Sequence, residues 1–190
     1  VIPHELTHLV FDTAVTNPYH FPPRWLNEGV AEYQSQGYDA GYRATIEEAA
    51  RSGELIPLDG LTGQFPTTRE RFGLAYAEST AAVDYLVETY GQDALVTLVR
   101  SYASGLTDDE AFSAALGVDA SAFGGGDVAG VAHFYGCLAQ AGNVAGRGWT
   151  GALAGETAAS DRVCAARIAG RGRGHQAAWR PQRRARPPAR

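Results

Sequence analysis

Two histidines near the start of the chain, His4 and His8, lie four positions apart in the segment His-Glu-Leu-Thr-His. Residues four apart share one face of an α-helix, so the two imidazoles could converge on one metal ion. Glu28, twenty positions after His8, supplies a carboxylate from a second predicted helix. Two histidines and one glutamate form a three-ligand zinc set that leaves a fourth coordination position open for water. The spacing therefore predicts a catalytic Zn²⁺ site formed by His4, His8 and Glu28.

Two further glutamates fit the same chemistry. Glu5 follows His4 directly, and we expect its carboxylate to point into the same cleft. There it would act as the catalytic general base, taking a proton from water and returning it to the leaving amine. Glu32 lies one helical turn after Glu28, where we expect it to accept a hydrogen bond from the free ring N–H of a ligating histidine.

The order of these motifs resembles that of one enzyme superfamily. His-Glu-Leu-Thr-His at 4–8, followed by Trp-Leu-Asn-Glu-Gly at 25–29, resembles the peptidase MA (gluzincin) superfamily of thermolysin-like zinc metallopeptidases. The nineteen residues between His8 and Glu28 match the thermolysin spacing. Weaker similarity to a compact bacterial subgroup of peptidase MA-like domains extends over residues 1–123. The resemblance implies a zinc metallopeptidase that hydrolyses peptide bonds in a peptide or protein substrate.

The resemblance also implies a hydrogen-bond donor for the tetrahedral oxyanion of the reaction, because gluzincins supply a tyrosine or a histidine from a later helix. Tyr76, in the segment Ala-Tyr-Ala-Glu-Ser, is our candidate for this catalytic role. The alternative for Tyr76 is a core aromatic residue whose hydroxyl reaches the surface. The sequence leaves these two interpretations equally open.

Three functional hypotheses follow, and the zinc peptidase is the favoured one. The second is a catalytically inactive zinc-binding scaffold, and the intact Glu5 argues against it because such a protein needs no general base. The third is a helical binding module with an accidental motif, since five-residue patterns also occur by chance. The paired Glu28 and Glu32 argue against that reading. Zinc content separates the third hypothesis from the others, and peptide cleavage separates the first from the second.

The remaining pattern predicts a mainly α-helical domain. Apolar residues recur at three- and four-residue steps, and glycine or proline separates the runs. Thr107 and Glu110 form a predicted capping box. The segment 56–68 is expected to be a loop at the rim of the substrate site, and Gly29 is expected to let the two metal-binding helices pack closely. The predicted helices span residues 3–15, 22–37, 42–52, 71–90, 93–103 and 108–116, with a last turn capped by Asp119.

The two ends of the chain carry separate expectations. A gluzincin normally has a sheet before the first metal-binding helix, so the resemblance predicts a helical half-domain whose N-terminal sheet is missing from this chain. The predicted domain spans residues 1–123. Residues 124–190 are Gly-, Ala- and Arg-rich, which is typical of a disordered arm or of a translation artefact from GC-rich DNA. We favour the artefact. Cys137 and Cys164 lie in this tail without the CxxC spacing of a zinc knuckle or redox motif.

Charge is distributed unevenly along the chain. Residues 1–127 hold 19 acidic residues and 6 arginines, a net charge of −13, whereas residues 128–190 hold 2 acidic residues and 10 arginines, a net charge of +8. The acidic part argues against nucleic acid as the main partner. No segment is apolar and long enough to predict a membrane span.

Overall fold

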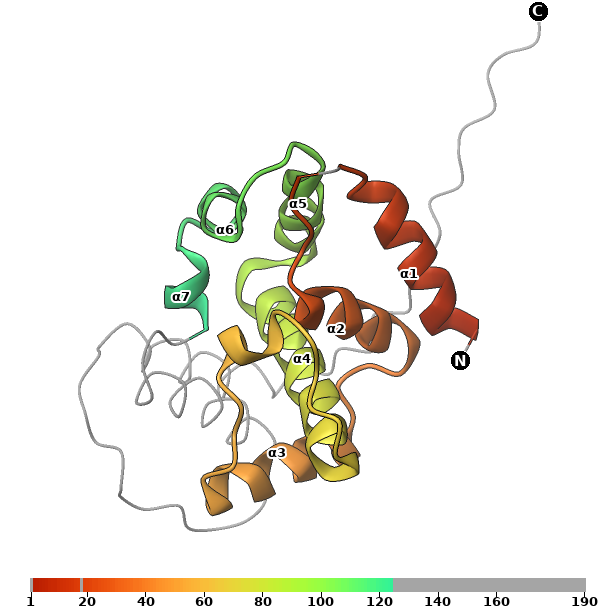
Figure 1. Cartoon of the computed structure of the whole chain (residues 1–190), viewed down its shortest axis with the longest axis vertical. Coiled ribbons are helices and arrows are strands. Elements are labelled where there is room, and N and C mark those ends of the chain that lie inside the picture. The colour runs from red at the N-terminus through yellow and green to blue at the C-terminus, as the bar shows by residue number, and fades with distance from the viewer. Residues whose placement is uncertain (1, 18, 125–190) are drawn as a thin grey trace, which may run out of the picture.

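The computed structural model describes residues 2–17 and 19–124, and this part of the chain contains helices and no strands. The predicted mainly α-helical class is confirmed, while the expectations for the tail and for its two cysteines lie outside the described residues. None of the described helices is long and apolar enough to cross a bilayer. The elements are α1 (Ile2–Ala14), α2 (Arg24–Ser35), α3 (Ala40–Ser52), the 3-10 turn η1 (Leu58–Leu61), α4 (Arg69–Tyr90), α5 (Gln92–Ala103), α6 (Asp108–Leu116) and α7 (Ala120–Phe123), as Figure 1 shows.

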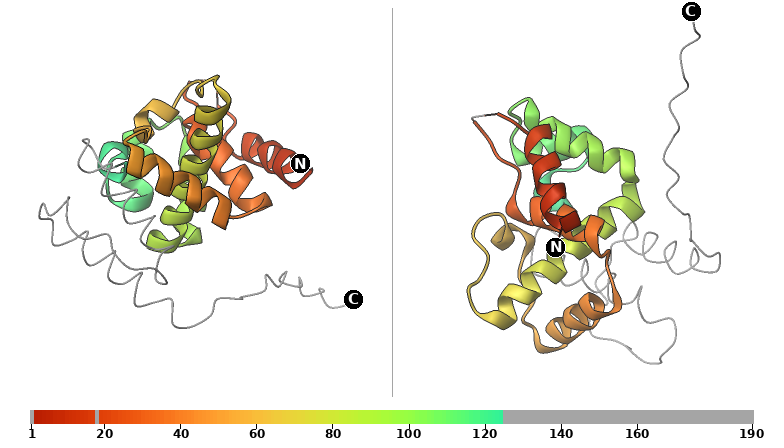
Figure 2. Two further views of the ribbon diagram at one scale, coloured as in Figure 1. Left: turned by 90° about the horizontal axis from the view of Figure 1, so that it is seen from below. Right: turned by 90° about the vertical axis from the view of Figure 1, so that its right-hand side faces the viewer.

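The long helix α4 runs through the middle of the bundle and contacts α2, α3 and α5 (Figures 1 and 2). Small residues occupy many of its buried positions, which lets the neighbouring helices come close. The closest approach involves α2. A Cβ atom added to Gly29 would lie 2.5 Å from the backbone oxygen of Ser79 on α4. The small buried residues of α4 are Ala75, Ala77, Ser79, Ala81 and Ala82.

Gly29 therefore corrects one expectation. The sequence predicts that this glycine lies between the two candidate metal-binding helices, α1 and α2. In the structure its missing side chain makes room for α4 instead. Helix α2 contacts both α1 and α4. The metal motif alone does not reveal which of these two helices the glycine faces.

The helix ends follow local signals that the sequence already contains. Thr107 accepts a hydrogen bond from the Glu110 N–H, and the Glu110 carboxylate accepts one from the Thr107 N–H, so the predicted capping box is confirmed. Asp119 caps the short helix α7 through the Ala122 N–H. Gly117 ends α6 in the left-handed region, at φ 75°, which glycine adopts without the steric cost of a Cβ atom.

The segment 56–68, predicted to be a loop at the rim of the substrate site, has mostly exposed residues and is anchored to the core by a few apolar side chains. We call it the rim segment and keep that name. It forms η1 and buries Ile56, Leu61 and Phe65 against the helices. Its Ile56 N–H donates a hydrogen bond of 2.9 Å to the fully buried carboxylate of Glu78 on α4. Glycine and proline correctly indicated irregular backbone here, but they do not indicate burial.

Helix α1 lies at the edge of the molecule in Figure 1 and in the left view of Figure 2. It contacts α2 and α5, and Phe11 is its buried residue. Three apolar side chains of this helix face outward, and the residues Leu6, Leu9 and Val10 are between 55% and 69% exposed. The sheet expected before this helix stays a prediction.

Candidate metal centre

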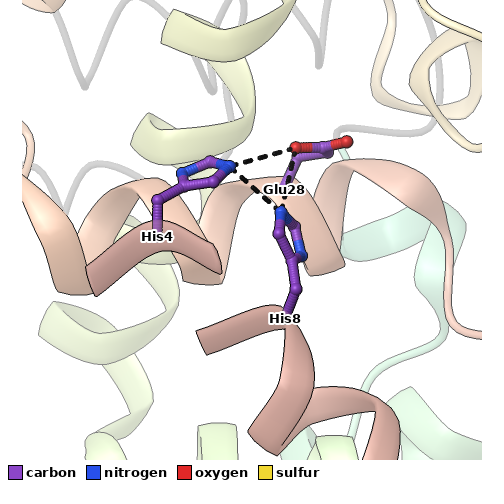
Figure 3. A group of neighbouring side chains, drawn as sticks. All are labelled: His4, His8 and Glu28. Carbon is purple, nitrogen blue, oxygen red and sulfur yellow. Dashed lines mark hydrogen bonds and ion pairs between the residues drawn. The ribbon is translucent and has the colours of Figure 1, made fainter. Parts of the chain in front are cut away.

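The structure brings His4 and His8 of α1 together with Glu28 of α2 (Figure 3). The two Nε2 atoms are 3.0 Å apart, and they lie 3.7 Å and 3.5 Å from Oε2 of Glu28. Figure 3 shows both rings turning a nitrogen towards the same oxygen of the carboxylate. These three side chains are partly buried at the junction of the two helices, and they could hold one metal ion.

Hydrogen bonds on the far side of each ring set the direction of the ligand atoms. Nδ1 of His4 donates to Oε2 of Glu32 at 2.8 Å, and Nδ1 of His8 donates to Oδ1 of Asn27 at 2.7 Å. Both partner atoms are acceptors, so each Nδ1 carries the ring hydrogen. Each Nε2 is therefore left with a lone pair that faces the common point. Outer hydrogen bonds of this kind fix the tautomer of metal-binding histidines.

Glu32 is itself held firmly in place. Its side chain is almost fully buried, and its Oε1 accepts hydrogen bonds from the Tyr42 hydroxyl and the Gln36 amide. Burial raises the pKa of Tyr42, and the hydrogen bond and negative charge of Glu32 raise it further. The phenol therefore stays protonated and keeps donating, so residues from α2 and α3 support the orientation of His4.

The carboxylate of Glu28 contacts a different partner at each oxygen. Its Oε2 accepts a hydrogen bond from the Tyr76 hydroxyl at 3.0 Å, and its Oε1 accepts one from Arg24 at 3.3 Å. Burial raises the pKa of Tyr76 to about 12, and the neighbouring charge of Glu28 adds to the shift. Tyr76 is thus a protonated donor at neutral pH. Its ring packs against Phe65 and Phe72, so it is at once a packing residue and a neighbour of the metal centre.

Glu5 lies on α1 beside His4, and its side chain is exposed to solvent. A general base must exchange protons with water and with the reacting groups, so this exposure suits the role expected of it. The structure thus places Glu5 on α1, the helix that carries both histidines, and Tyr76 on α4, where its hydroxyl contacts Glu28.

The geometry of the three ligand atoms suits a zinc ion. Ligands at about 2.0–2.1 Å from a tetrahedral zinc are about 3.3–3.4 Å apart, and the observed separations of 3.0, 3.5 and 3.7 Å bracket that value. The Nε2 atoms of His4 and His8 also face one another at 3.0 Å, a contact that requires either a proton or a metal ion between the two nitrogens. Two neutral imidazoles and a carboxylate are ligands that zinc accepts.

A family model of the peptidase MA superfamily matches residues 1–126 of the chain. The chain belongs to the peptidase MA superfamily. No curated protein and no solved structure gives a significant match to it. Within this superfamily member, the matched range contains α1 to α7 and every residue of the metal centre.

Several residues around the centre escaped the sequence analysis. Asn27 precedes Glu28 directly, and a polar side chain at that position could have suggested contact with a histidine. Arg24 lies one turn before Glu28, the spacing of an intrahelical ion pair. Gln36 lies one turn after Glu32, at the same spacing. Tyr42 carries no comparable signal, because it reaches Glu32 from α3, a helix that packs on α4.

A separate cavity of about 830 Å³ lies among α2, α3, η1, α6 and α7. Its walls include the apolar side chains of Trp25, Leu58 and Phe112 and the carboxylate of Asp108. His20, on the segment between α1 and α2, lines it and bonds to Asp108 at 3.2 Å. None of the metal-centre residues lines this cavity, and the sequence did not predict it.

Proposed function

We propose that this member of the peptidase MA superfamily is a zinc metallopeptidase that hydrolyses peptide bonds in a peptide or protein substrate. The observation that carries the proposal is the convergence of three ligand atoms, two of them on histidine rings that hydrogen bonds at Nδ1 hold in orientation. Nε2 of His4, Nε2 of His8 and Oε2 of Glu28 share one point, and Glu32 and Asn27 hold the two rings. Superfamily membership supports the same reading.

His4, His8 and Glu28 would hold the ion and leave a coordination position accessible to solvent. A bound zinc supplies Lewis-acid chemistry, polarising a carbonyl and lowering the pKa of water towards neutrality. Glu5 would accept the proton of the attacking water and pass it to the leaving amine. Glu5 follows His4 directly on α1, and the proposal requires its carboxylate to reach the point where the ligand atoms meet.

Tyr76 would stabilise the oxyanion. In the structure its hydroxyl donates to Oε2 of Glu28, so during the reaction this hydrogen would turn from the carboxylate to the substrate oxygen. The raised pKa of Tyr76 keeps the hydrogen available throughout the neutral range. Donors placed where charge develops are among the largest contributions to catalysis.

Metal content tests the binding half of the proposal. Metal-free full-length protein is reloaded with zinc, and the stoichiometry is measured by elemental analysis for the parent, His8→Ala and His20→Ala. We expect one tightly bound zinc in the parent and in His20→Ala, which removes a histidine outside the centre, and much weaker binding in His8→Ala. Parental affinity in His8→Ala would refute the ligand set.

Peptide cleavage tests the catalytic half. The zinc-loaded parent is incubated with a random peptide library, and the products are identified by mass spectrometry. We expect cleavage that stops on addition of a chelator and returns with zinc. A parent that binds zinc and cuts no peptide would favour the inactive scaffold instead.

A further inference from the structure

The two oxygens of the Glu28 carboxylate face different surroundings. Figure 3 shows one oxygen directed at His4 and His8 and the other directed away from them. The first is Oε2, which also accepts the Tyr76 hydrogen bond. The second is Oε1, whose partner is the Arg24 guanidinium at 3.3 Å. A carboxylate can bind a metal through one oxygen or both, so what holds Oε1 decides how many coordination positions Glu28 fills.

Arg24 is tethered to the rim segment at two points. Its backbone N–H donates to the Thr62 oxygen at 2.9 Å, and its guanidinium carbon lies 4.8 Å from the centre of the Phe65 ring. Phe65 is buried and contacts Tyr76 edge-on. A cation on an aromatic face is attracted by the ring and is restricted in orientation. These two contacts restrict the position of the guanidinium that binds Oε1.

The Arg24–Glu28 ion pair contributes little to the free energy of folding. The Arg24 side chain is 40% exposed, and exposed pairs at this helical spacing contribute little to folding. Its effect on Glu28 is geometric, because Arg24 binds one oxygen while Tyr76 binds the other from a different helix. Two partners on opposite oxygens resist rotation of the carboxylate about its terminal bond.

We propose that Arg24 is a positioning residue that keeps Glu28 bound to the ion through Oε2 alone. This inference rests on the proposed zinc site and adds to it. With Oε1 held by Arg24, Glu28 occupies one coordination position, and space remains for both water and the substrate carbonyl. Without Arg24 the carboxylate can turn and bind through both oxygens, which fills a position that the reaction needs.

The test replaces zinc by Co²⁺ in the full chain and records the visible absorption spectrum. Four-coordinate Co²⁺ absorbs visible light far more strongly than five- or six-coordinate Co²⁺, so the spectrum reports the coordination number directly. We expect Arg24→Gln to weaken the visible bands relative to the parent. We also expect its zinc affinity, measured by chelator competition, to fall by about ten- to a hundredfold, as losses around a metal ligand usually do.

Two further variants separate this role from a general loss of charge. Arg51→Gln removes the arginine of another exposed intrahelical pair, with Glu48 on α3, and should leave spectrum and affinity at parental values. Arg24→Lys keeps the charge but not the planar group, and should lose less zinc affinity than Arg24→Gln.

The outcomes distinguish the two proposals. If the parent binds cobalt while Arg24→Gln and Arg24→Lys keep its spectrum and zinc affinity, the role of Arg24 is refuted and the metal site stands. If the parent binds neither cobalt nor zinc, the metal site and the role of Arg24 both fall.

Discussion

Hydrogen bonds orient the histidine pair without help from an ion. Glu32 and Asn27 each accept a ring hydrogen at Nδ1, so the ligand atoms of His4 and His8 are directed before binding. Such preorganisation lowers the reorganisation that a metal or a transition state would otherwise require. The ring partners Glu32 and Asn27 therefore belong to the candidate metal centre together with the ligand atoms.

Glu5 is the residue whose replacement best separates binding from catalysis. In Glu5→Gln the amide cannot accept a proton, while His4, His8 and Glu28 remain unchanged. We expect parental zinc content and a loss of turnover of roughly two to four orders of magnitude, the usual contribution of a general base. Steady-state kinetics on whichever peptide the parent cuts measures the loss.

An exposed glutamate on another helix provides the control for this substitution. Glu88→Gln on α4 makes the same chemical change away from the centre and should keep parental turnover. Near-parental rates in zinc-loaded Glu5→Gln would exclude Glu5 as the base.

Helix α2 packs between α1 and α4, and different residues of α2 contact each of these helices. Glu28 and Glu32 meet the histidines of α1, whereas Gly29 meets the backbone of α4. The depth at which α2 packs on α4 therefore sets the distance between Glu28 and the two histidines. Packing of the core and geometry of the centre are coupled through one glycine.

Gly29→Ala should test this coupling. Alanine favours a helix by about 1 kcal/mol over glycine, but its Cβ would lie 2.5 Å from the Ser79 oxygen, a backbone atom that no rotamer change can move. Overpacking typically costs about 1–3 kcal/mol, so we expect a net loss of stability together with weaker zinc binding. Urea denaturation and chelator competition measure the two effects.

Gly73→Ala is the matched control on α4. A Cβ atom at Gly73 meets nothing within 4 Å, so helix propensity acts alone and should raise the free energy of unfolding by up to about 1 kcal/mol. Equal stabilisation by both substitutions would show that α2 can move away from α4 at no cost.

Features that depend on nearby residues could be predicted from the sequence. The four-residue spacing of His4 and His8 placed both rings on one helical face, and the Thr107 capping box placed the start of α6. The proximity of Glu28 to the pair could be predicted as well, because the gap between the two motifs matches the thermolysin spacing.

Features that depend on tertiary packing could not be predicted in this way. Tyr42 comes from α3, which packs on α4, and only the folded arrangement of the helices brings its hydroxyl to Glu32. Burial of the apolar side chains of the rim segment likewise follows from tertiary contact, including that of η1 with α4, since the composition of the segment resembles that of a surface loop. The sequence predicted that Gly29 allows close helix packing, but the predicted neighbour, α1, was wrong because the glycine faces α4.

A buried acid joins the rim segment to the central helix α4. Glu78 is fully buried; its Oε1 accepts the Ile56 N–H, and its Oε2 has no hydrogen-bond partner among the described residues. Burial raises the pKa of Glu78 to about 8, although the Ile56 hydrogen bond and the charge of Arg71 oppose the shift. The acid is therefore mostly protonated in the folded protein near neutral pH.

The raised pKa predicts how stability depends on pH. Because the folded state binds the Glu78 proton more tightly than the unfolded state, its contribution is fully present below pH 4.5. It is lost as the pH rises towards 8, with a slope of up to about 1.4 kcal/mol per pH unit. Glu78→Gln keeps an acceptor for Ile56 and does not titrate. The stability of the parent relative to Glu78→Gln should therefore fall between pH 5 and pH 8, as measured by urea denaturation.

Glu70→Gln, an exposed position in the first turn of the same helix, controls for the loss of one titratable acid. It should leave the pH dependence of the parent unchanged. A parent whose stability tracks that of Glu78→Gln at every pH would show that Glu78 is ionised in the folded protein.

Helix α1 is held by little apolar contact, since it buries Phe11 and turns Leu6, Leu9 and Val10 to solvent. An ion bound by residues of both α1 and α2 would therefore cross-link α1, at the edge of the bundle, to the rest of the domain. An ion that binds only the folded state raises the free energy of unfolding by about 2.7 kcal/mol when the free ion concentration is a hundred times the dissociation constant. Much of the anchoring of α1 would then depend on the zinc concentration, and a chelator would loosen the N-terminal helix before it unfolded the remainder.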